Sequence, residues 1–166
     1  MEFTCKIPPY QRRLHAVMAG MSPERKMTDM SPERKMTELL SRFADPGGTP
    51  SLSEIRAVRE GLSIDIVNGL VKAGTLTTAE LDRLGIPQSA VRSGRLSADQ
   101  SDRLVRVVRV VSEAIDTFAN KEKALRWLRH PADVLDGQTP LELLYTDIGA
   151  RTVETLLRRI AHGIAA

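Results

Sequence analysis

One amphipathic segment, residues 98–119, does most to restrict the folds open to this chain. Apolar side chains recur in it at i, i+3, i+4 and i+7, which places them on one face of an α-helix. These side chains belong to Leu104, Val107, Val108, Val111, Ile115 and Phe118. Arg103, Arg106 and Arg109 fall on another face. We therefore expect one long helix here that serves as the spine of the fold.

Helix-start signals recur through residues 51–166. A capping box, in which Ser or Thr is followed three residues later by Glu or Gln, occurs at 51–54, 77–80, 97–100 and 139–142. Glycines typical of helix C-termini stand where the apolar patterns end, at Gly61, Gly74, Gly85 and Gly163. Aromatic residues make up only 4% of the chain, which favours helices packed through aliphatic side chains. An all-α fold is therefore expected.

The first fifty residues differ from the rest of the chain. Two nearly identical nonapeptides stand in tandem there, MSPERKMTD at 21–29 and MSPERKMTE at 30–38, and nine residues are too few for a stacking structural repeat. The segment 43–53, FADPGGTPSLS, breaks helix and strand alike. We expect residues 1–50 to be a flexible leader that the main function does not need. The ordered body then divides into a domain at 51–119, which includes the spine, and a smaller domain at 120–166.

Residues 51–119 are expected to form a helix-turn-helix-like domain. The pattern predicts helices at 53–60, 64–73 and 78–84 and a very short one near 87–92, ahead of the spine. The second helix of a helix-turn-helix enters the major groove of DNA, and residues 86–95 hold that place. The candidate DNA-binding residues are Gln88, Ser89, Arg92, Ser93 and Arg95. Residues 83–109 carry six Arg and two Asp, a surplus that suits a phosphate backbone and equally suits a solvated helix face.

The pattern of residues 120–166 predicts a small helical domain. Asn120 would cap a helix that ends at His130, since the following proline disfavours helix in the residue before it. Thr139 would cap a short helix and Thr146 a final one. The final helix has an inner apolar face of Val153, Leu156, Leu157, Ile160 and Ile164.

This C-terminal stretch resembles the toxin-binding domain of the Xre/MbcA/ParS antitoxins. The resemblance rests on KALRWLR at 123–129, Pro131, Leu135, Gly137, TPLELL at 139–144, Thr146, GAR at 149–151, Val153, Glu154, Leu157, Arg159, Ile160 and Gly163. Upstream, GRLS at 94–97 and SDRL at 101–104 are similar to the family's junction between an Xre-like helix-turn-helix bundle and the long helix. The similarity begins near residue 60 and does not include the leader.

The resemblance implies a partner and a mode of action. In this family the partner is a RES-domain toxin that consumes NAD⁺, and the antitoxin covers its active site with the C-terminal helix and tail. Members also form homodimers that repress their own operon, which would make operator DNA a second partner. The alternative is a helix-turn-helix DNA-binding transcriptional regulator whose toxin control is secondary or lost. The segment 87–94 is shorter and less basic than the family's recognition segment. The sequence therefore indicates operator binding less strongly than toxin binding.

The resemblance also assigns residues to toxin binding. They are Trp127, Arg151, Glu154, Arg158, Arg159, His162, Gly163, Ile164, Ala165 and Ala166. Those from Arg158 onward would lie nearest to the toxin's NAD⁺ pocket. A basic helix end could bind charged groups of the toxin, or it could simply complement the helix dipole. Trp127 could be an interface anchor or the largest residue of the core.

Little in the sequence indicates an enzyme. His15, His130 and His162 lack metal-ligand spacing, and the dinucleotide fingerprint, the P-loop and the nucleophile elbow are absent. A single cysteine, Cys5, excludes an internal disulfide. No apolar run approaches the roughly 18 residues of a membrane span. We expect no catalytic residue, no cofactor, no metal and no membrane partner, and a cytoplasmic location.

Overall fold

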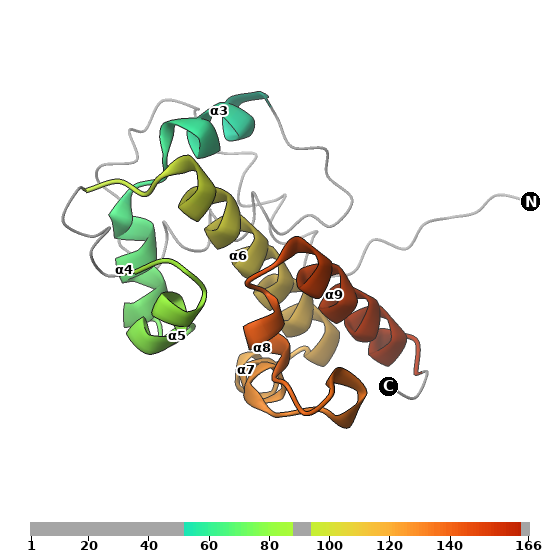
Figure 1. Ribbon diagram of the computed structural model, residues 1–166. Coiled ribbons are helices and arrows are strands. Elements are labelled where there is room, and N and C mark those ends of the chain that lie inside the picture. The colour runs from blue at the N-terminus through green and yellow to red at the C-terminus, as the bar shows by residue number, and fades with distance from the viewer. Residues whose placement is uncertain (1–51, 88–93, 164–166) are drawn as a thin grey trace, which may run out of the picture. The chain divides into compact units, whose positions relative to one another are not determined.

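A computed structural model describes residues 52–87 and 94–163 of the chain (Figure 1). Within these residues the regular structure is helical, apart from one isolated bridge between Ser63 and Arg95. In chain order the helices are α3 (Leu52–Glu60), α4 (Ile64–Lys72), α5 (Thr78–Arg83), α6 (Ala98–Phe118), α7 (Lys121–Arg129), the 3-10 helix η3 (Asp133–Leu135), α8 (Pro140–Leu143) and α9 (Asp147–Ala161). The all-α prediction is confirmed.

The spine is α6, a helix of 21 residues whose bounds agree with the prediction to within one residue. The Ser97 hydroxyl accepts a hydrogen bond from the Gln100 N–H, and the Gln100 side chain accepts one from the Ser97 N–H, so the expected capping box starts the helix. At the other end Ala119 adopts a left-handed conformation with φ 49°, which stops the helix. Because α6 contacts α3, α7 and α9, it packs on more than one side.

The shorter helices also begin and end where the sequence predicts. Capping boxes start α5 at Thr77 and α8 at Thr139, and Asn120 caps α7. The four glycines expected at helix ends all have positive φ. The capping box at Ser51 and most of the short helix expected near 87–92 lie outside the described residues.

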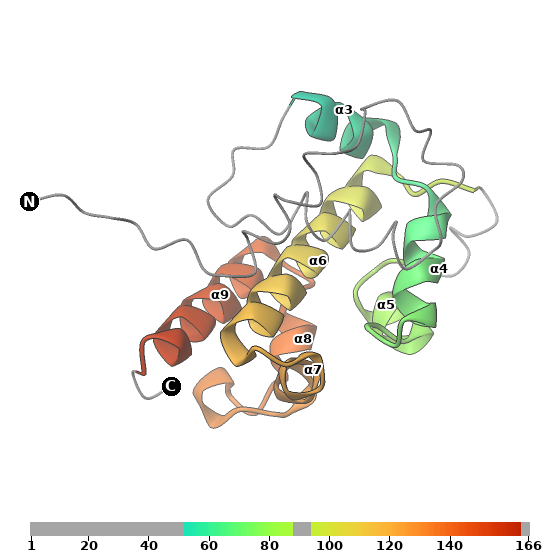
Figure 2. The same cartoon turned by 180° about the vertical axis from the view of Figure 1, so that it is seen from behind.

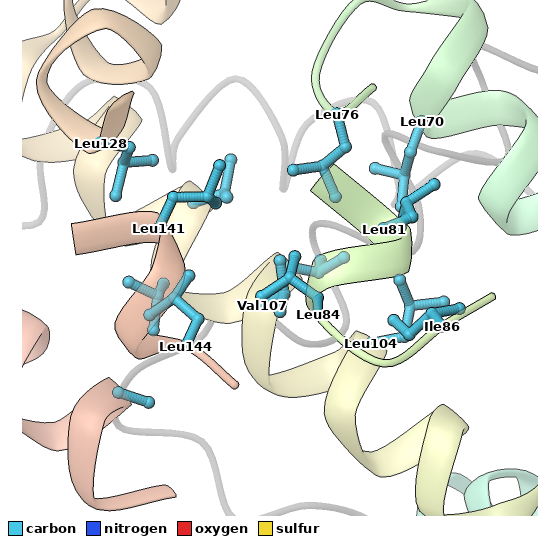
Figure 3. Close-up of a cluster of buried hydrophobic side chains, with 14 of the residues drawn as sticks. Leu70, Leu76, Leu81, Leu84, Ile86, Leu104, Val107, Leu128, Leu141 and Leu144 are labelled. Carbon is cyan, nitrogen blue, oxygen red and sulfur yellow. The ribbon is translucent and has the colours of Figure 1, made fainter. Parts of the chain in front are cut away.

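One hydrophobic core runs along α6 (Figure 3). It joins side chains of α4 and α5, of α6, and of α7 and α8, among them Leu70, Leu81, Leu84, Leu104, Val107, Leu128, Leu141 and Leu144. In both views α4 and α5 lie to one side of α6 and α9 lies to the other, while α7 and α8 lie by the C-terminal end of α6 (Figures 1 and 2). The domain boundary that we place between residues 119 and 120 stays a prediction, and the core continues across it.

Polar contacts also hold the α4–α5 side against α7. Arg129 donates to both carboxylate oxygens of Glu80, at 2.6 and 3.1 Å, and to the carbonyl of Thr75 at 3.2 Å. Lys121 donates to the carbonyl of Ala73 at 2.7 Å. Burial alone would raise the pKa of Glu80, but hydrogen bonds from Arg129 and Thr77 outweigh it and hold that pKa below its ordinary value. The α4–α5 pair and α7 are therefore fixed to each other by charge as well as by the core.

Candidate functional site

The two faces of α9 differ in chemistry. Ala150, Val153 and Leu157 on its inner face are buried in the core against α6. Of the other inner-face residues expected from the sequence, Leu156 is buried, Ile160 is half-buried, and Ile164 lies outside the described residues. The outer face is exposed and carries Ile148, Arg151, Thr152, Thr155, Arg159 and His162.

A close backbone approach at Gly149 sets the angle between α8 and α9. The Thr146 hydroxyl caps α9 by accepting a hydrogen bond from the Gly149 N–H at 3.1 Å. A side chain at position 149 would overlap the carbonyl of Leu143, so this position requires glycine. The corner between the two helices is therefore tight, and it holds the outer face of α9 toward solvent.

A charge network joins α6 to the middle of α9. Glu154 is buried and accepts hydrogen bonds from Nε and Nη2 of Arg109, at 3.1 and 2.7 Å. Arg158 approaches both Glu154, at 3.7 Å, and Glu113, at 3.6 Å. Glu154, which the sequence resemblance assigns to toxin binding, thus lies in the contact between α6 and α9.

Glu113 is the member of this network whose charged form is disfavoured. Burial raises the pKa of its carboxyl and the charge of Glu154 raises it further, while Arg158 and Arg109 offset only part of the rise. The pKa of Glu113 therefore lies above its ordinary value. Its charged form makes the folded protein less stable wherever the pH exceeds that pKa.

Replacing Glu113 with glutamine is expected to leave stability at pH 7 unchanged or raised by up to about 1 kcal/mol, because the disfavoured charge is removed. As the pH falls from 7 toward the ordinary glutamate pKa, protonation relieves the wild-type protein of the same cost, so the difference should shrink. Urea unfolding of both proteins across this range measures it. A variant less stable than wild type at pH 7 would show that the contact with Arg158 outweighs the penalty.

The basic end of α9 is exposed. Arg158 and Arg159 lie in its last turn, His162 is the C-cap, and Gly163 has φ 68°. Near the start of the helix Arg151 is exposed too and pairs with Asp147 at 2.8 Å. The expected toxin-binding residues Ile164, Ala165 and Ala166 lie outside the described residues.

Trp127 lies on α7, away from this helix end. Its ring centroid is 5.6 Å from that of Phe118, and both side chains pack against the core while staying half-buried. A part of the indole is thus used for packing between α6 and α7, and another part remains accessible.

The candidate DNA-binding residues are described in part. Gln88, Ser89, Arg92 and Ser93 lie outside the described residues, whereas Arg95 is exposed just after them. Its Nε donates to the carbonyl of Gly61 at 3.1 Å. The backbone around it pairs with the start of α4, where the Ile64 N–H donates to the carbonyl of Gly94 at 3.2 Å. Arg95 is thereby positioned at the edge of the expected recognition segment.

The three arginines of the spine do not form a solvated face. Arg103 donates to the carbonyls of Leu84 and Gly85, and its guanidinium lies 4.6 Å from the centroid of the Tyr145 ring. Arg106 pairs with Asp102 at 2.7 Å, and Arg109 is bound by Glu154. The sequence showed a surplus of charge here but not these contacts, because their partners lie up to 45 residues away.

The described residues also include no group of three or more His, Cys, Asp or Glu side chains that could hold a metal ion. None of the described helices is long and apolar enough to cross a membrane.

Two parts of the chain match known protein families. Residues 53–109 match the Antitoxin Xre-like helix-turn-helix domain, and residues 113–163 match the Antitoxin Xre/MbcA/ParS C-terminal toxin-binding domain. The second match contains α7, α8 and α9.

Three proteins named Antitoxin Xre are similar to the chain over most of their own length. The one from Yersinia enterocolitica is 32% identical over 117 residues, which cover 66% of this chain and 79% of the relative. The one from Photorhabdus laumondii is 35% identical over 124 residues, with coverage of 70% and 82%. The one from Pseudomonas putida is 33% identical over 111 residues, with coverage of 64% and 69%.

Proposed function

The chain belongs to the Xre antitoxin family, and from this premise we propose that it neutralises a RES-domain toxin that degrades NAD⁺. The family resemblance inferred from the sequence is confirmed, while the RES domain of the partner is our proposal. Inhibition would occur when α9 and the residues that follow it cover the toxin's active site. The protein would thus act by binding in the cytoplasm, with no reaction of its own.

The end of α9 carries this proposal. It lies inside the toxin-binding match and exposes basic side chains. Arg158, Arg159 and His162 are exposed there, on a helix whose inner face is buried against α6. A helix held in this way presents its basic groups from a backbone that is already ordered, so binding does not pay the cost of ordering that backbone. Carboxylates at the entrance of the toxin's active site would form charge-assisted hydrogen bonds with these groups.

Co-expression with the RES-domain protein encoded beside the antitoxin gene tests the proposal. The full chain is expected to restore growth and the cellular NAD⁺ level and to co-purify with the toxin. Deletion of residues 161–166 is expected to keep the fold, because the buried residues of α9 end before it, but to weaken inhibition at least about tenfold.

Deletion of residues 1–50 is the matched control, because we expect the leader to be unnecessary for inhibition. Circular dichroism and the midpoint of urea unfolding check that both shortened chains fold. Unchanged toxicity with the full chain and no complex on co-purification would exclude a RES-domain partner. Equal inhibition by the chain that lacks 161–166 would exclude the covering of the active site by this end.

The helix-turn-helix match favours a second activity, binding of the chain to its own operator DNA as a homodimer. The exposed position of Arg95 beside the expected recognition segment supports it. In the alternative, this regulatory role would be the main one and toxin control secondary. Salt-dependent binding to the promoter fragment, weakened by Arg92→Ala, is the expected result. Promoter binding that Arg92→Ala leaves intact would place the DNA contact elsewhere.

A further inference from the structure

Ile148, in the first turn of α9, has a large apolar side chain that does not pack in the core. Its side chain is 80% exposed, more than any other large hydrophobic residue described within the toxin-binding match. We propose that Ile148 is the apolar anchor of a docking stripe on α9 that fits a groove on the toxin. The stripe comprises Ile148, Thr152, Thr155, Arg159 and His162. This inference rests on the proposed function, because the toxin is its occupant.

The stripe has the geometry of a helix that binds in a groove. Its five residues follow one another at i, i+4, i+7, i+11 and i+14, which places them on a single face of the helix. All five are exposed, and the opposite face is buried against α6. At 1.5 Å per residue the stripe is about 21 Å long. The helix can therefore offer this face to a partner without leaving the core.

The hydroxyl protons at the centre of the stripe are already bonded within the helix. The Thr152 hydroxyl donates to the carbonyl of Ile148 at 3.1 Å, and the Thr155 hydroxyl donates to the carbonyl of Arg151 at 2.8 Å. Each threonine therefore offers a partner its methyl group and a hydroxyl oxygen that can only accept a hydrogen bond. Covering these residues leaves no hydroxyl donor without an acceptor, so burial under a toxin costs little.

The charges of α9 indicate the chemistry of the occupant. Its two acids are Asp147, which Arg151 binds, and Glu154, which is turned inward to Arg109. Arg159 and His162 stand at the other end of the stripe, on the same exposed face. The groove that fits is therefore apolar where it receives Ile148 and acidic where it receives the end of α9.

The same charges argue against a second copy of this chain as the occupant. If two stripes packed antiparallel about Thr155, Arg151 of each copy would face Arg159 of the other. If they packed in parallel about a two-fold axis, each arginine would face its own equivalent. Like charges would meet in either arrangement, whereas an acidic groove would complement them.

The affinity of the full chain for the adjacent RES-domain protein tests the stripe. Ile148→Asp is expected to weaken binding at least about 30-fold, the loss typical of a buried hot-spot residue. Thr155→Tyr, which places bulk at the centre of the stripe, should weaken it to a similar degree. Isothermal titration of the purified proteins measures both, and circular dichroism should show unchanged helix content because both positions are exposed.

Leu52→Asp is the matched control, since Leu52 is an 86% exposed apolar residue of α3, a helix that lies outside the toxin-binding match. It should bind the toxin like the wild type.

Binding by both stripe variants within threefold of wild type would overturn the inference. So would a loss of self-association on ultracentrifugation with toxin affinity unchanged, because the stripe would then join two copies. If the wild type itself does not bind the RES-domain protein, the proposed function fails, a result distinct from failure of the stripe.

Discussion

Replacing Gly149 with valine is expected to destabilise the protein by about 3 kcal/mol or more and to abolish inhibition of the toxin. Glycine is required here because a side chain would overlap the backbone carbonyl of Leu143, which cannot rotate away as a side-chain end could. Relief requires α9 to move away from α8, and that movement opens the packing of Val153 and Leu157 on α6. The midpoint of urea unfolding and the co-expression assay measure the two effects.

A sharper test of this close approach is whether the smaller substitution Gly149→Ala raises or lowers the stability of the protein. Alanine in place of a helical glycine ordinarily stabilises a protein by about 0.4–1 kcal/mol. At this position it should destabilise instead. Thr152→Ala on the exposed face of the same helix is the control and should change stability by no more than about 0.5 kcal/mol. A gain in stability from Gly149→Ala would mean that the corner between α8 and α9 yields easily.

The helices of this fold could be predicted because their signals are local. The capping boxes that begin α5, α6 and α8 each lie within four consecutive residues, and each is formed as expected. The inner face of α9 follows from the 3.6-residue period, which places Val153 and Leu157 together. A period of this kind fixes which residues are buried but not which neighbour buries them.

The contacts between helices could not be predicted for that reason. Arg129 and Glu80 bind each other across 49 residues, and nothing near either of them in the sequence indicates the pairing. The spine arginines were expected at a surface or on phosphate, yet Arg103 and Arg109 bind groups of the protein itself. Ile148 was missed for the opposite reason, because an isolated apolar residue outside the inner face gives no pattern.

Replacing Arg109 with methionine is expected to destabilise the protein by about 2 kcal/mol, the second large effect. It leaves the buried carboxylate of Glu154 beside Glu113 and paired with Arg158 at 3.7 Å. An unpaired buried charge costs about 3–5 kcal/mol, and the smaller figure allows for the 38% exposure of the Arg109 side chain. Urea unfolding at several pH values measures the loss. Without Arg109 the pKa of Glu113 should rise further, so the deficit should shrink as the pH falls through that pKa and the carboxyl becomes neutral.

A double-mutant cycle then separates the two roles open to Glu154. If Glu154 acts by holding α9 on α6, Glu154→Leu alone should be destabilising, whereas Arg109→Met with Glu154→Leu should recover most of the lost stability, because an apolar pair can replace a buried ion pair. The double variant should then also inhibit the toxin, since the outer face of α9 is unchanged. A stable double variant that no longer inhibits would show instead that the Glu154 carboxylate contacts the toxin directly. Its burial at 8% exposure and its bond to Arg109 favour the positioning role.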